Sequence, residues 1–323
     1  MTESSLSVGS HALSAKALAE RRLGDRAFKW LTLLMALSVF VLIVLIGIEL
    51  WLGSHLAIQK FGARFLTSSE WDPVKERFGA LPFIFGTLVS SGVALFIAVP
   101  LSIASAVFLT ELAPPWLRQP LIIFIELLAA LPSVILGLWG IFVMVPWLRE
   151  YLFPCLKSAL GFLPLFQGPI YGVSVLAGGI IIAIMIVPII TSVSREILRS
   201  VPGLQREAAY ALGATRWEVT RIAVLSYAKK GLFGAVILGL GRALGETMAV
   251  TMVIGNRPEV AASLFAPGYT LASVVANEFT EATTDLYLHS LFEIGLVLLG
   301  VTIAVNAAAQ VLLKTFGGPI VTR

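Results

Sequence analysis

The amino-acid sequence predicts an all-α, polytopic integral membrane protein with about six transmembrane helices. Hydrophobic residues make up 58% of the 323 residues and charged residues only 13%, which is more apolar surface than one soluble globule can bury. A membrane-spanning helix needs about 20 consecutive, mainly apolar residues, and stretches of that length recur along the chain. The predicted spans are residues 30–52, 81–110, 121–147, 172–193, 231–255 and 288–312.

Basic residues are distributed unevenly among the predicted connections. The N-terminal tail, the connections after spans 2 and 4 and the C-terminus together hold 15 Lys and Arg residues, whereas the connections after spans 1, 3 and 5 hold seven. Because cytoplasmic loops carry an excess of Lys and Arg, both termini are predicted to be cytoplasmic. Residues 1–28 then form a cytoplasmic N-terminal tail. The apolar run behind this tail is too long for a cleaved signal peptide, which favours an uncleaved signal anchor.

Composition argues against several other classes of chemistry. The formal net charge is +4, and the basic residues lie where membrane topology requires them, so this charge does not indicate a nucleic-acid partner. The single cysteine, Cys155, cannot form an internal disulfide, and His11, His55 and His289 have no metal-ligand spacing. The sequence therefore predicts no metal site and no cofactor.

The connections and bends along the first half of the chain are also predictable. Residues 53–80 contain "FLTSSEWDPVKERFG", a mixed-charge stretch that either packs over the span ends or forms an ordinary structured loop. In span 3, Pro132 predicts a bend, and Glu126 should face protein, because a carboxylate facing lipid costs a few kcal/mol. Residues 148–171 hold three prolines, which predicts an interfacial hairpin and not a span.

The inward connection at residues 194–231 contains its own helix signals. Pro202 stands where a first helical turn tolerates proline, and Gly213 is placed to end that helix in a left-handed conformation. Thr215 and Glu218 form a T-x-x-E capping box that starts a second helix. The first helix carries an apolar stripe of Leu204, Ala208, Ala211 and Leu212. Two short helices are therefore predicted to meet at Gly213; a DNA-binding helix-turn-helix is disfavoured, because spans flank the pair on both sides.

The stretch "EAAYALGATRWEVTRIAVLS" resembles the EAA loop of ATP-binding cassette importer permeases. The matching positions are Glu207, Ala208, Ala209, Gly213 and Leu225. Ala223 and Ser226 depart from the family pattern, which has isoleucine and proline there, so the helix after the turn should continue straighter than usual. The resemblance implies a coupling helix at residues 202–215 that docks on a partner ATPase dimer, with Glu207 and Gly213 fixing its shape.

Flanking stretches narrow the resemblance. "GALPFIFGTLVSS", "ALPSVILGLWGIF" and "GLGRALGETMAVTMVIGN" are similar to the PstC type of permease from phosphate-specific importers, over about residues 60 to 313. This implies that residues 29–323 form a permease domain with the importer permease fold. It also implies a bacterial inner (cytoplasmic) membrane location, a homologous second permease as heterodimer partner, and a soluble phosphate-binding protein. The chain has no G-x-x-x-x-G-K-[ST] motif, so it is predicted to be non-catalytic, with ATP hydrolysed by the separate ATPase.

Arg242 and Glu246 interrupt the apolar span 5. A guanidinium near mid-bilayer costs about 2.5 to 3.5 kcal/mol on insertion scales, so something must compensate it. One interpretation is a structural ion pair that fixes helix packing. The other is that the pair lines the path of the transported anion. The planar fork of arginine suits a tetrahedral oxyanion, and Glu246 either orients that fork or accepts a hydrogen bond from the proton that phosphate carries.

The charges of Arg242 and Glu246 cancel, so a dianion needs further positive charge from elsewhere. No other basic residue lies inside a predicted span, which predicts that the second permease supplies it. Gly241 and Gly245 form a G-x-x-x-G spacing that allows close helix approach, either at that interface or within this chain. The string "GLGRALG" is no dinucleotide-binding loop, because it lies inside a membrane span.

Three alternatives to a phosphate permease remain open from sequence. A permease for sulfate or molybdate would differ in its competition profile during uptake. A proton-coupled secondary transporter would use Glu126 and Glu246 as relays and would stop when an uncoupler is added. A membrane-bound signalling scaffold would sense phosphate without moving it.

Overall fold

The computed structural model describes residues 4–316 of the chain, and the side chains of residues 1–24, including His11, lie outside the described part. The described residues form helices and loops, with only isolated β-bridges between single residue pairs. Six helices in this part are long and apolar enough to cross a membrane, which confirms the predicted number. Their bounds are Phe28–Gly53, Leu81–Leu112, Ser133–Leu160, Val175–Arg199, Arg216–Leu244 and Asp285–Thr315.

Two compact units make up the chain, residues 1–52 and residues 53–323. The first consists mainly of α1 (Ser4–Gly53), one continuous helix that joins most of the predicted tail to the first span. No proline occurs between its ends, so nothing removes a hydrogen bond from its backbone ladder.

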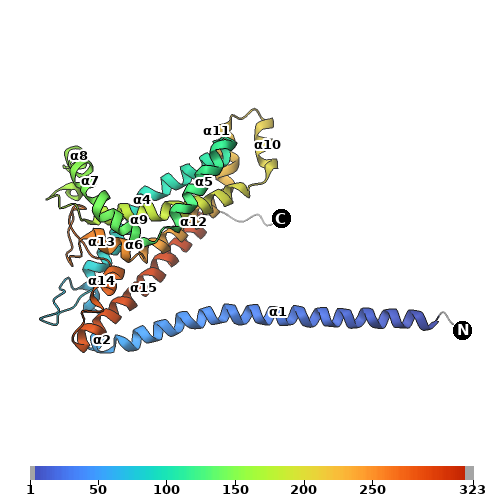
Figure 1. Ribbon diagram of the computed structural model, residues 1–323, viewed down its shortest axis with the longest axis horizontal. Helices are drawn as coiled ribbons and strands as arrows, with labels where there is room; N and C mark the ends of the chain where they lie inside the picture. Colours follow the sequence, from blue (N-terminus) through green and yellow to red (C-terminus); the bar gives the residue numbers. More distant parts are fainter. Residues whose placement is uncertain (1–3, 317–323) are drawn as a thin grey trace. The chain divides into compact units, whose positions relative to one another are not determined.

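The core of the second unit is built around α9 (Val175–Arg199), whose apolar window is 72% buried. Its neighbours are α4 (Leu81–Val107) and α12 (Ser226–Leu244), as Figure 1 shows. Small residues allow this packing: a Cβ at Gly179 would lie 2.5 Å from the Val93 side chain. The Ser102 hydroxyl donates to the Val187 carbonyl at 3.1 Å, which adds a polar contact between α4 and α9.

The third span differs from its prediction of residues 121–147. Helix α5 (Pro115–Ala130) ends before Leu131, which is extended with ψ 130°. The residue before a proline is pushed out of the helical region, so Pro132 separates two helices where a bend was predicted. The run after it comprises α6 (Ser133–Trp139), the π-helical turn η2 (Gly140–Met144), α7 (Val145–Trp147), the π-helical turn η3 (Leu148–Leu152) and α8 (Phe153–Leu160).

The predicted interfacial hairpin at residues 148–171 is therefore wrong over its first half. The helix continues to Leu160 although Pro154 lies inside it; Pro154 comes just after the π-helical turn η3, and local π adjustments of this kind accommodate proline in membrane helices. Beyond Leu160 the chain forms a short 3-10 helix, η4 (Pro164–Phe166), and loops.

The fifth span begins earlier and ends earlier than the predicted residues 231–255. A single helix runs from Arg216 to Leu244. It is composed of α11 (Arg216–Glu218), the π-helical turn η5 (Val219–Leu225) and α12. After a break the chain forms α13 (Met248–Ile254). The helix passes through Ser226, where the family pattern has proline, directly after the π-helical turn η5.

Short helices and aromatic side chains gather at one end of the second unit. They are α2 (His55–Phe61), α3 (Arg64–Thr67), α14 (Leu271–Glu278) and the start of α15 (Asp285–Phe316). Figure 1 shows α10 (Gly203–Ala211) and α11 at the other end. Because three spans separate residues 54–80 from α10 along the chain, the two regions lie on opposite faces of the membrane.

Candidate functional site

Helix α10 and the turn behind it have the geometry that the sequence predicts. Gly213 has φ +81°, which is the left-handed conformation predicted for the end of the helix. The Thr215 N–H donates to Glu218 Oε2 at 2.8 Å, and the Glu218 N–H donates to Thr215 Oγ1 at 3.4 Å, so the capping box is confirmed. The helix that it starts is the long Arg216–Leu244 helix. The prediction of two short helices is therefore wrong for the second one.

The side of α10 that faces away from the spans carries apolar side chains that no other described residue covers. No residue of α10 is buried, and Leu212 just after it is 89% exposed. The predicted stripe of Leu204, Ala208, Ala211 and Leu212 is exposed throughout, together with Tyr210 and Trp217. Glu207, Ala208, Ala209 and Gly213, the residues predicted to meet the ATPase, lie on α10 and its terminal turn. Large apolar side chains left exposed on and beside one short helix favour an interaction site there.

Arg206 fixes the inner side of α10 to two spans, and sequence reasoning missed it. Its guanidinium donates to the Val201 carbonyl at 2.6 Å and to the Leu198 carbonyl at 2.9 Å, near the C-terminal end of α9, where carbonyls lack helical partners. It also pairs with Glu111 at 3.0 Å. Glu111 belongs to η1 (Phe108–Leu112), the π-helical turn that ends the α4 helix. Both charged side chains are largely buried, so this contact ties α10 to α4 and α9 together.

Arg242 and Glu246 form an ion pair at a break between two helices. The Arg242 Nη2 atom lies 3.3 Å from Glu246 Oε2. Helix α12 ends at Leu244, and Gly245 has φ −92° and ψ 1°. The other Glu246 oxygen accepts a hydrogen bond from the Ala249 N–H at 3.4 Å, in the first turn of α13. The prediction of one continuous helix through both residues is therefore wrong.

This break places each charge at a favourable helix end. Arg242 lies in the last turn of α12, where the helix carries partial negative charge, and Glu246 precedes α13, whose first turn carries partial positive charge. The Glu246 side chain is 4% exposed, whereas that of Arg242 is 49% exposed. Arginine has five N–H donors, so the exposed part of the guanidinium can bind a further anion while the ion pair is kept. In membrane proteins, interrupted helices of this kind occur where they line a cavity or path.

The glycines of α12 divide into two sets. A Cβ at Gly239 would lie 2.6 Å from the Ile190 side chain, so this glycine allows α12 to pack on α9. A Cβ at Gly234 or Gly241 would meet no described atom within 4 Å. Gly241 is therefore not needed for close packing within the described part of this chain. The open face of α12 is the uncovered side that carries Gly241 and Arg242, next to Gly245 at the end of the helix.

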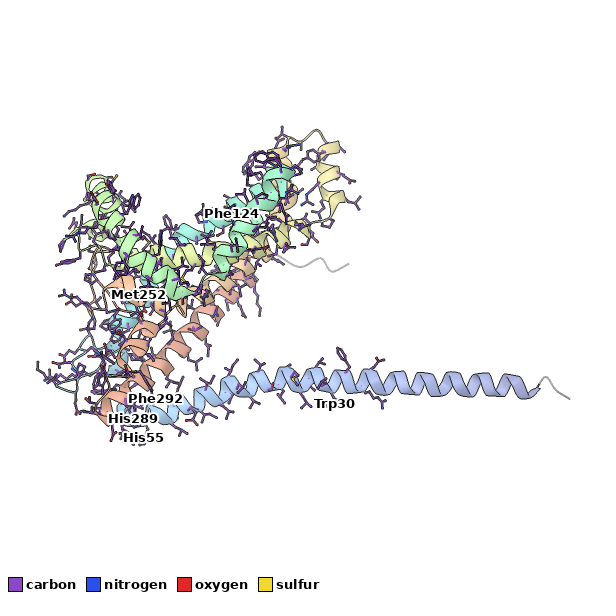
Figure 2. The ribbon with its side chains drawn as sticks, in the orientation of Figure 1. Trp30, His55, Phe124, Met252, His289 and Phe292 are labelled. Atoms are coloured by element: carbon purple, nitrogen blue, oxygen red, sulfur yellow. The ribbon has the colours of Figure 1, made fainter. Side chains whose placement is uncertain are left out.

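Glu126 has a local basic partner, and the two described histidines lie away from it. Glu126 of α5 lies 3.7 Å from Arg195, which also pairs with Glu196 at 2.8 Å. Glu126 thus faces a basic residue, although more than half of its side chain is exposed. His55 and His289 lie at the end where α2 contacts α15 (Figure 2). Among the side chains that the structure describes, no group of three His, Cys, Asp or Glu residues is placed to hold a metal ion.

Sequence comparison relates the chain to transport permeases. A family model described as binding-protein-dependent transport system inner membrane component matches residues 98–316. The chain is 48% identical over 295 residues to the phosphate transport system permease protein PstC of Mesorhizobium japonicum, which covers 90% of both chains. It is also 48% identical over 293 residues to PstC of Haemophilus influenzae, covering 90% of this chain and 93% of that protein. The probable PstC of Methanocaldococcus jannaschii is 38% identical over 293 residues, 89% of this chain and 93% of that protein.

Structural comparison supports the same fold. A chain of the methionine ABC transporter MetNI, in an inward-facing conformation, superposes with a TM-score of 0.53 and 16% identity. The match covers 75% of this chain and 95% of that one. At this identity the likeness concerns the fold alone, and it confirms the predicted importer permease fold.

Proposed function

The chain belongs to the family of binding-protein-dependent transport system inner membrane components, and we propose that it is the permease subunit of an ATP-driven importer of inorganic phosphate. The single observation that carries the proposal is the ion pair of Arg242 and Glu246 at the break between α12 and α13. The names of the relatives from Mesorhizobium and Haemophilus support phosphate as the cargo.

Phosphate fits the donors and acceptors of this site. The half-exposed Arg242 guanidinium donates charge-assisted hydrogen bonds to two phosphate oxygens. The buried Glu246 carboxylate holds that guanidinium and accepts a hydrogen bond from the proton of monohydrogen phosphate. Sulfate has no such proton at neutral pH, so it would bring its negative charge against the buried carboxylate with no donated hydrogen bond to offset the repulsion, which is an effective means of discrimination.

An ATPase dimer on the cytoplasmic side drives the transport cycle. The exposed apolar surface around Leu204 and Leu212 supports docking of this partner on α10. Arg206 then transmits the movement of α10 to α4 and α9. In this proposal the chain itself catalyses no reaction, both termini are cytoplasmic, and residues 1–28 form a cytoplasmic tail ahead of the permease domain.

A second, homologous permease completes the path as a heterodimer partner. The open face of α12 with Gly241 and Arg242 supports close contact with another helix there. Because Glu246 neutralises Arg242, the second permease contributes the additional positive charge that a dianion requires. A soluble phosphate-binding protein delivers the cargo to the face opposite α10, and the assembly lies in the bacterial inner membrane.

Uptake of labelled phosphate and sulfate tests this proposal. Cells that lack the chain receive the wild type, Arg242→Gln, or the matched control Arg149→Gln, at equal membrane abundance. Arg149 is an exposed arginine of η3, away from the break between α12 and α13. Hydrogen bonds to charged groups contribute about 1.5 to 3 kcal/mol, so Arg242→Gln should lower phosphate uptake about tenfold or more, while Arg149→Gln should transport normally.

Three results would contradict parts of the proposal. Normal phosphate uptake by Arg242→Gln would make the ion pair structural. Restored sulfate or molybdate uptake without phosphate uptake would identify another oxyanion as cargo. Uptake that stops with an uncoupler and persists without the ATPase would indicate a proton-coupled transporter.

A further inference from the structure

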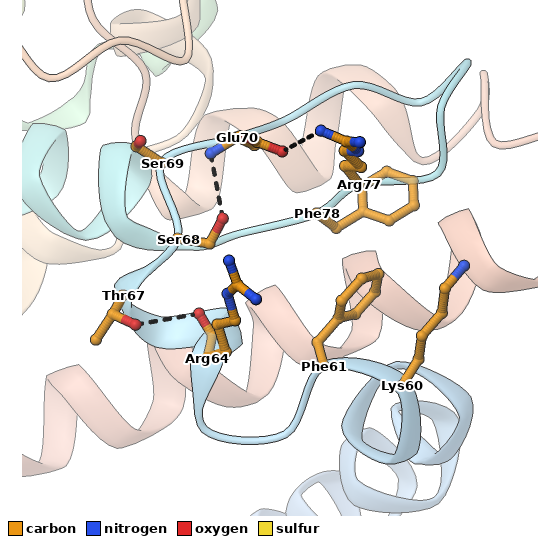
Figure 3. Close-up of a pocket in the computed structure, with 9 residues that line it drawn as sticks. All are labelled: Lys60, Phe61, Arg64, Thr67, Ser68, Ser69, Glu70, Arg77 and Phe78. Atoms are coloured by element: carbon orange, nitrogen blue, oxygen red, sulfur yellow. Dashed lines mark hydrogen bonds and ion pairs between the residues drawn. The ribbon is translucent and has the colours of Figure 1, made fainter.

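A basic pocket lies in the connection between α1 and α4, on the membrane face opposite α10. It has a volume of about 590 Å³. Three cationic side chains line it, those of Lys60, Arg64 and Arg77, against one acidic side chain, that of Glu70. Figure 3 shows these side chains around the hollow together with three hydroxyl groups and two phenyl rings.

The backbone that carries these side chains is held firmly. The Phe65 side chain next to Arg64 is 0% exposed, and the Phe78 side chain next to Arg77 is 2% exposed. The Ala80 N–H donates to the Phe65 carbonyl at 2.7 Å, which closes the base of the loop. The rings of Phe65 and Phe78 are thus packed in the interior, while the adjacent side chains of Arg64 and Arg77 line the pocket.

A turn centred on Asp72 fixes the far side of the loop. Its N–H donates to the Arg77 carbonyl at 2.8 Å, and its carboxylate accepts from the Val74 and Lys75 N–H groups at 3.1 Å. These backbone hydrogen bonds and the Lys75 side chain lower the pKa of Asp72. In addition, the indole N–H of Trp71 donates to a Glu278 oxygen at 2.8 Å. The pocket is thus formed before any ligand arrives.

Arg64 is the cation of the pocket that has no acidic partner. Lys60 pairs with Glu76 at 3.5 Å and Arg77 with Glu70 at 3.3 Å, and all four of these side chains are substantially exposed. Exposed pairs of this kind contribute at most about 1 kcal/mol, so an anion can recruit either cation. No carboxylate among the described residues lies within ion-pair distance of Arg64.

A hydroxyl group stands next to the free guanidinium. The Ser68 Oγ atom accepts from the Glu70 N–H at 3.3 Å, which leaves its hydrogen available for donation. Figure 3 shows the Arg64 guanidinium directed toward Ser68 inside the pocket. A planar arginine fork beside a hydroxyl donor is the combination that binds a small tetrahedral oxyanion.

We propose that this pocket binds inorganic phosphate at the membrane face opposite α10, as a second anion site separate from Arg242. Its excess of positive charge raises the local anion concentration at that face. The proposed binding of phosphate is argued from the side chains of the pocket alone. Its use as a waiting position, in which phosphate occupies the pocket before it enters the transport path, rests on the proposed function.

Thiol labelling in the pocket tests the binding directly. Ser69→Cys places a reporter on the lining in a Cys155→Ser background of the full chain in membrane vesicles. The rate of reaction with a negatively charged methanethiosulfonate should fall as inorganic phosphate is added. Arg64→Gln should abolish this protection. Lys75→Gln removes a positive charge of the same loop outside the pocket; it loses only an exposed pair with Asp72 and keeps the Lys75 N–H bond to Asp72, so it should retain the protection.

Two outcomes would overturn the proposal. Protection that is absent, or equal with and without Arg64, would show that the pocket holds no phosphate. Protection produced only by the phosphate-free binding protein would show that a protein side chain occupies it. Because labelling requires no transport, adding Arg242→Gln should leave the protection by phosphate unchanged. A negative result in the labelling experiment can therefore be told apart from a negative result in the uptake experiment on Arg242.

A transport measurement tests the use of the pocket. Arg64→Gln should raise the phosphate concentration for half-maximal uptake about threefold, because electrostatic attraction acts on the rate of association, and should keep the maximal rate. Lys75→Gln should match the wild type. An unchanged half-maximal concentration in Arg64→Gln would contradict the role as a waiting position.

Discussion

Glu246 is the most deeply buried charged residue near the break between α12 and α13, and its surroundings give it two tasks. One oxygen faces Arg242 and the other accepts from the Ala249 N–H. The first contact orients the guanidinium, and the second stabilises the start of α13. A carboxylate with both oxygens engaged in this way is held in one orientation, which suits it to distinguish anions by their protons.

Glu246→Gln tests that selectivity. The amide keeps the size of the side chain and adds N–H donors, so it no longer requires a proton from the anion. The preference for phosphate over sulfate in competition uptake should fall about tenfold or more. Glu126→Gln is the matched control, since Glu126 lies on α5 beside Arg195, and it should keep the preference. Unchanged selectivity in Glu246→Gln would limit Glu246 to orienting Arg242.

At the scale of elements, the sequence indicates helix boundaries where a local chemical signal marks them. The capping box at Thr215, the glycine Gly213 and the pre-proline residue Leu131 mark boundaries through local chemistry. The break at Gly245 carries no comparable signal, because glycine is common inside membrane helices. The contact between Arg206 and Glu111 joins residues 95 positions apart, which no local pattern predicts.

The Arg206 contact predicts how α10 is coupled to the spans. Arg206→Lys keeps the charge but loses the fork that reaches Glu111, Leu198 and Val201 at once. In the reconstituted complex, phosphate transported per ATP hydrolysed should fall about twofold to thirtyfold, while ATP hydrolysis continues. Arg199→Lys is the matched control at the exposed end of α9.

A double-mutant cycle separates coupling from simple stability. Glu111→Gln should lower the amount of phosphate transported per ATP hydrolysed. In the double variant with Arg206→Lys, the loss should be smaller than the sum of the two single losses, because both variants remove the same contact. Strict additivity, or equal losses of transport and ATP hydrolysis, would contradict the coupling role of Arg206.

At the scale of the whole molecule, α9 connects the two candidate sites. Its C-terminal carbonyls bind Arg206, and its middle packs on α12 close to Gly239. Composition and apolar stretches were sufficient to predict the number of spans, and the EAA resemblance predicted where α10 lies. Which face of α12 stays open follows only from the packed structure, because Gly239 and Gly241 look alike in sequence.

The open face predicts opposite effects of two glycine variants. Gly241→Leu should leave thermal unfolding of the isolated chain in detergent nearly unchanged, because its Cβ meets no described atom within 4 Å. It should nevertheless reduce co-purification of the second permease, because a large side chain prevents close helix approach. Gly239→Leu should instead destabilise the chain itself, because it overlaps Ile190. Normal heterodimer yield with Gly241→Leu would contradict an interface on this face.

One continuous helix, Arg216–Leu244, joins the turn behind α10 to Arg242 and includes the π-helical turn η5. It has 29 residues, and at a rise of 1.5 Å per residue Arg242 lies about 39 Å along the rod from Arg216. A tilt of about 5° about the Arg216 end carries the guanidinium sideways by roughly 3 Å, which is the length of a hydrogen bond. Under the proposed function, a small tilt imposed from the α10 end of this helix would therefore shift Arg242 far enough to break its hydrogen bond to an anion.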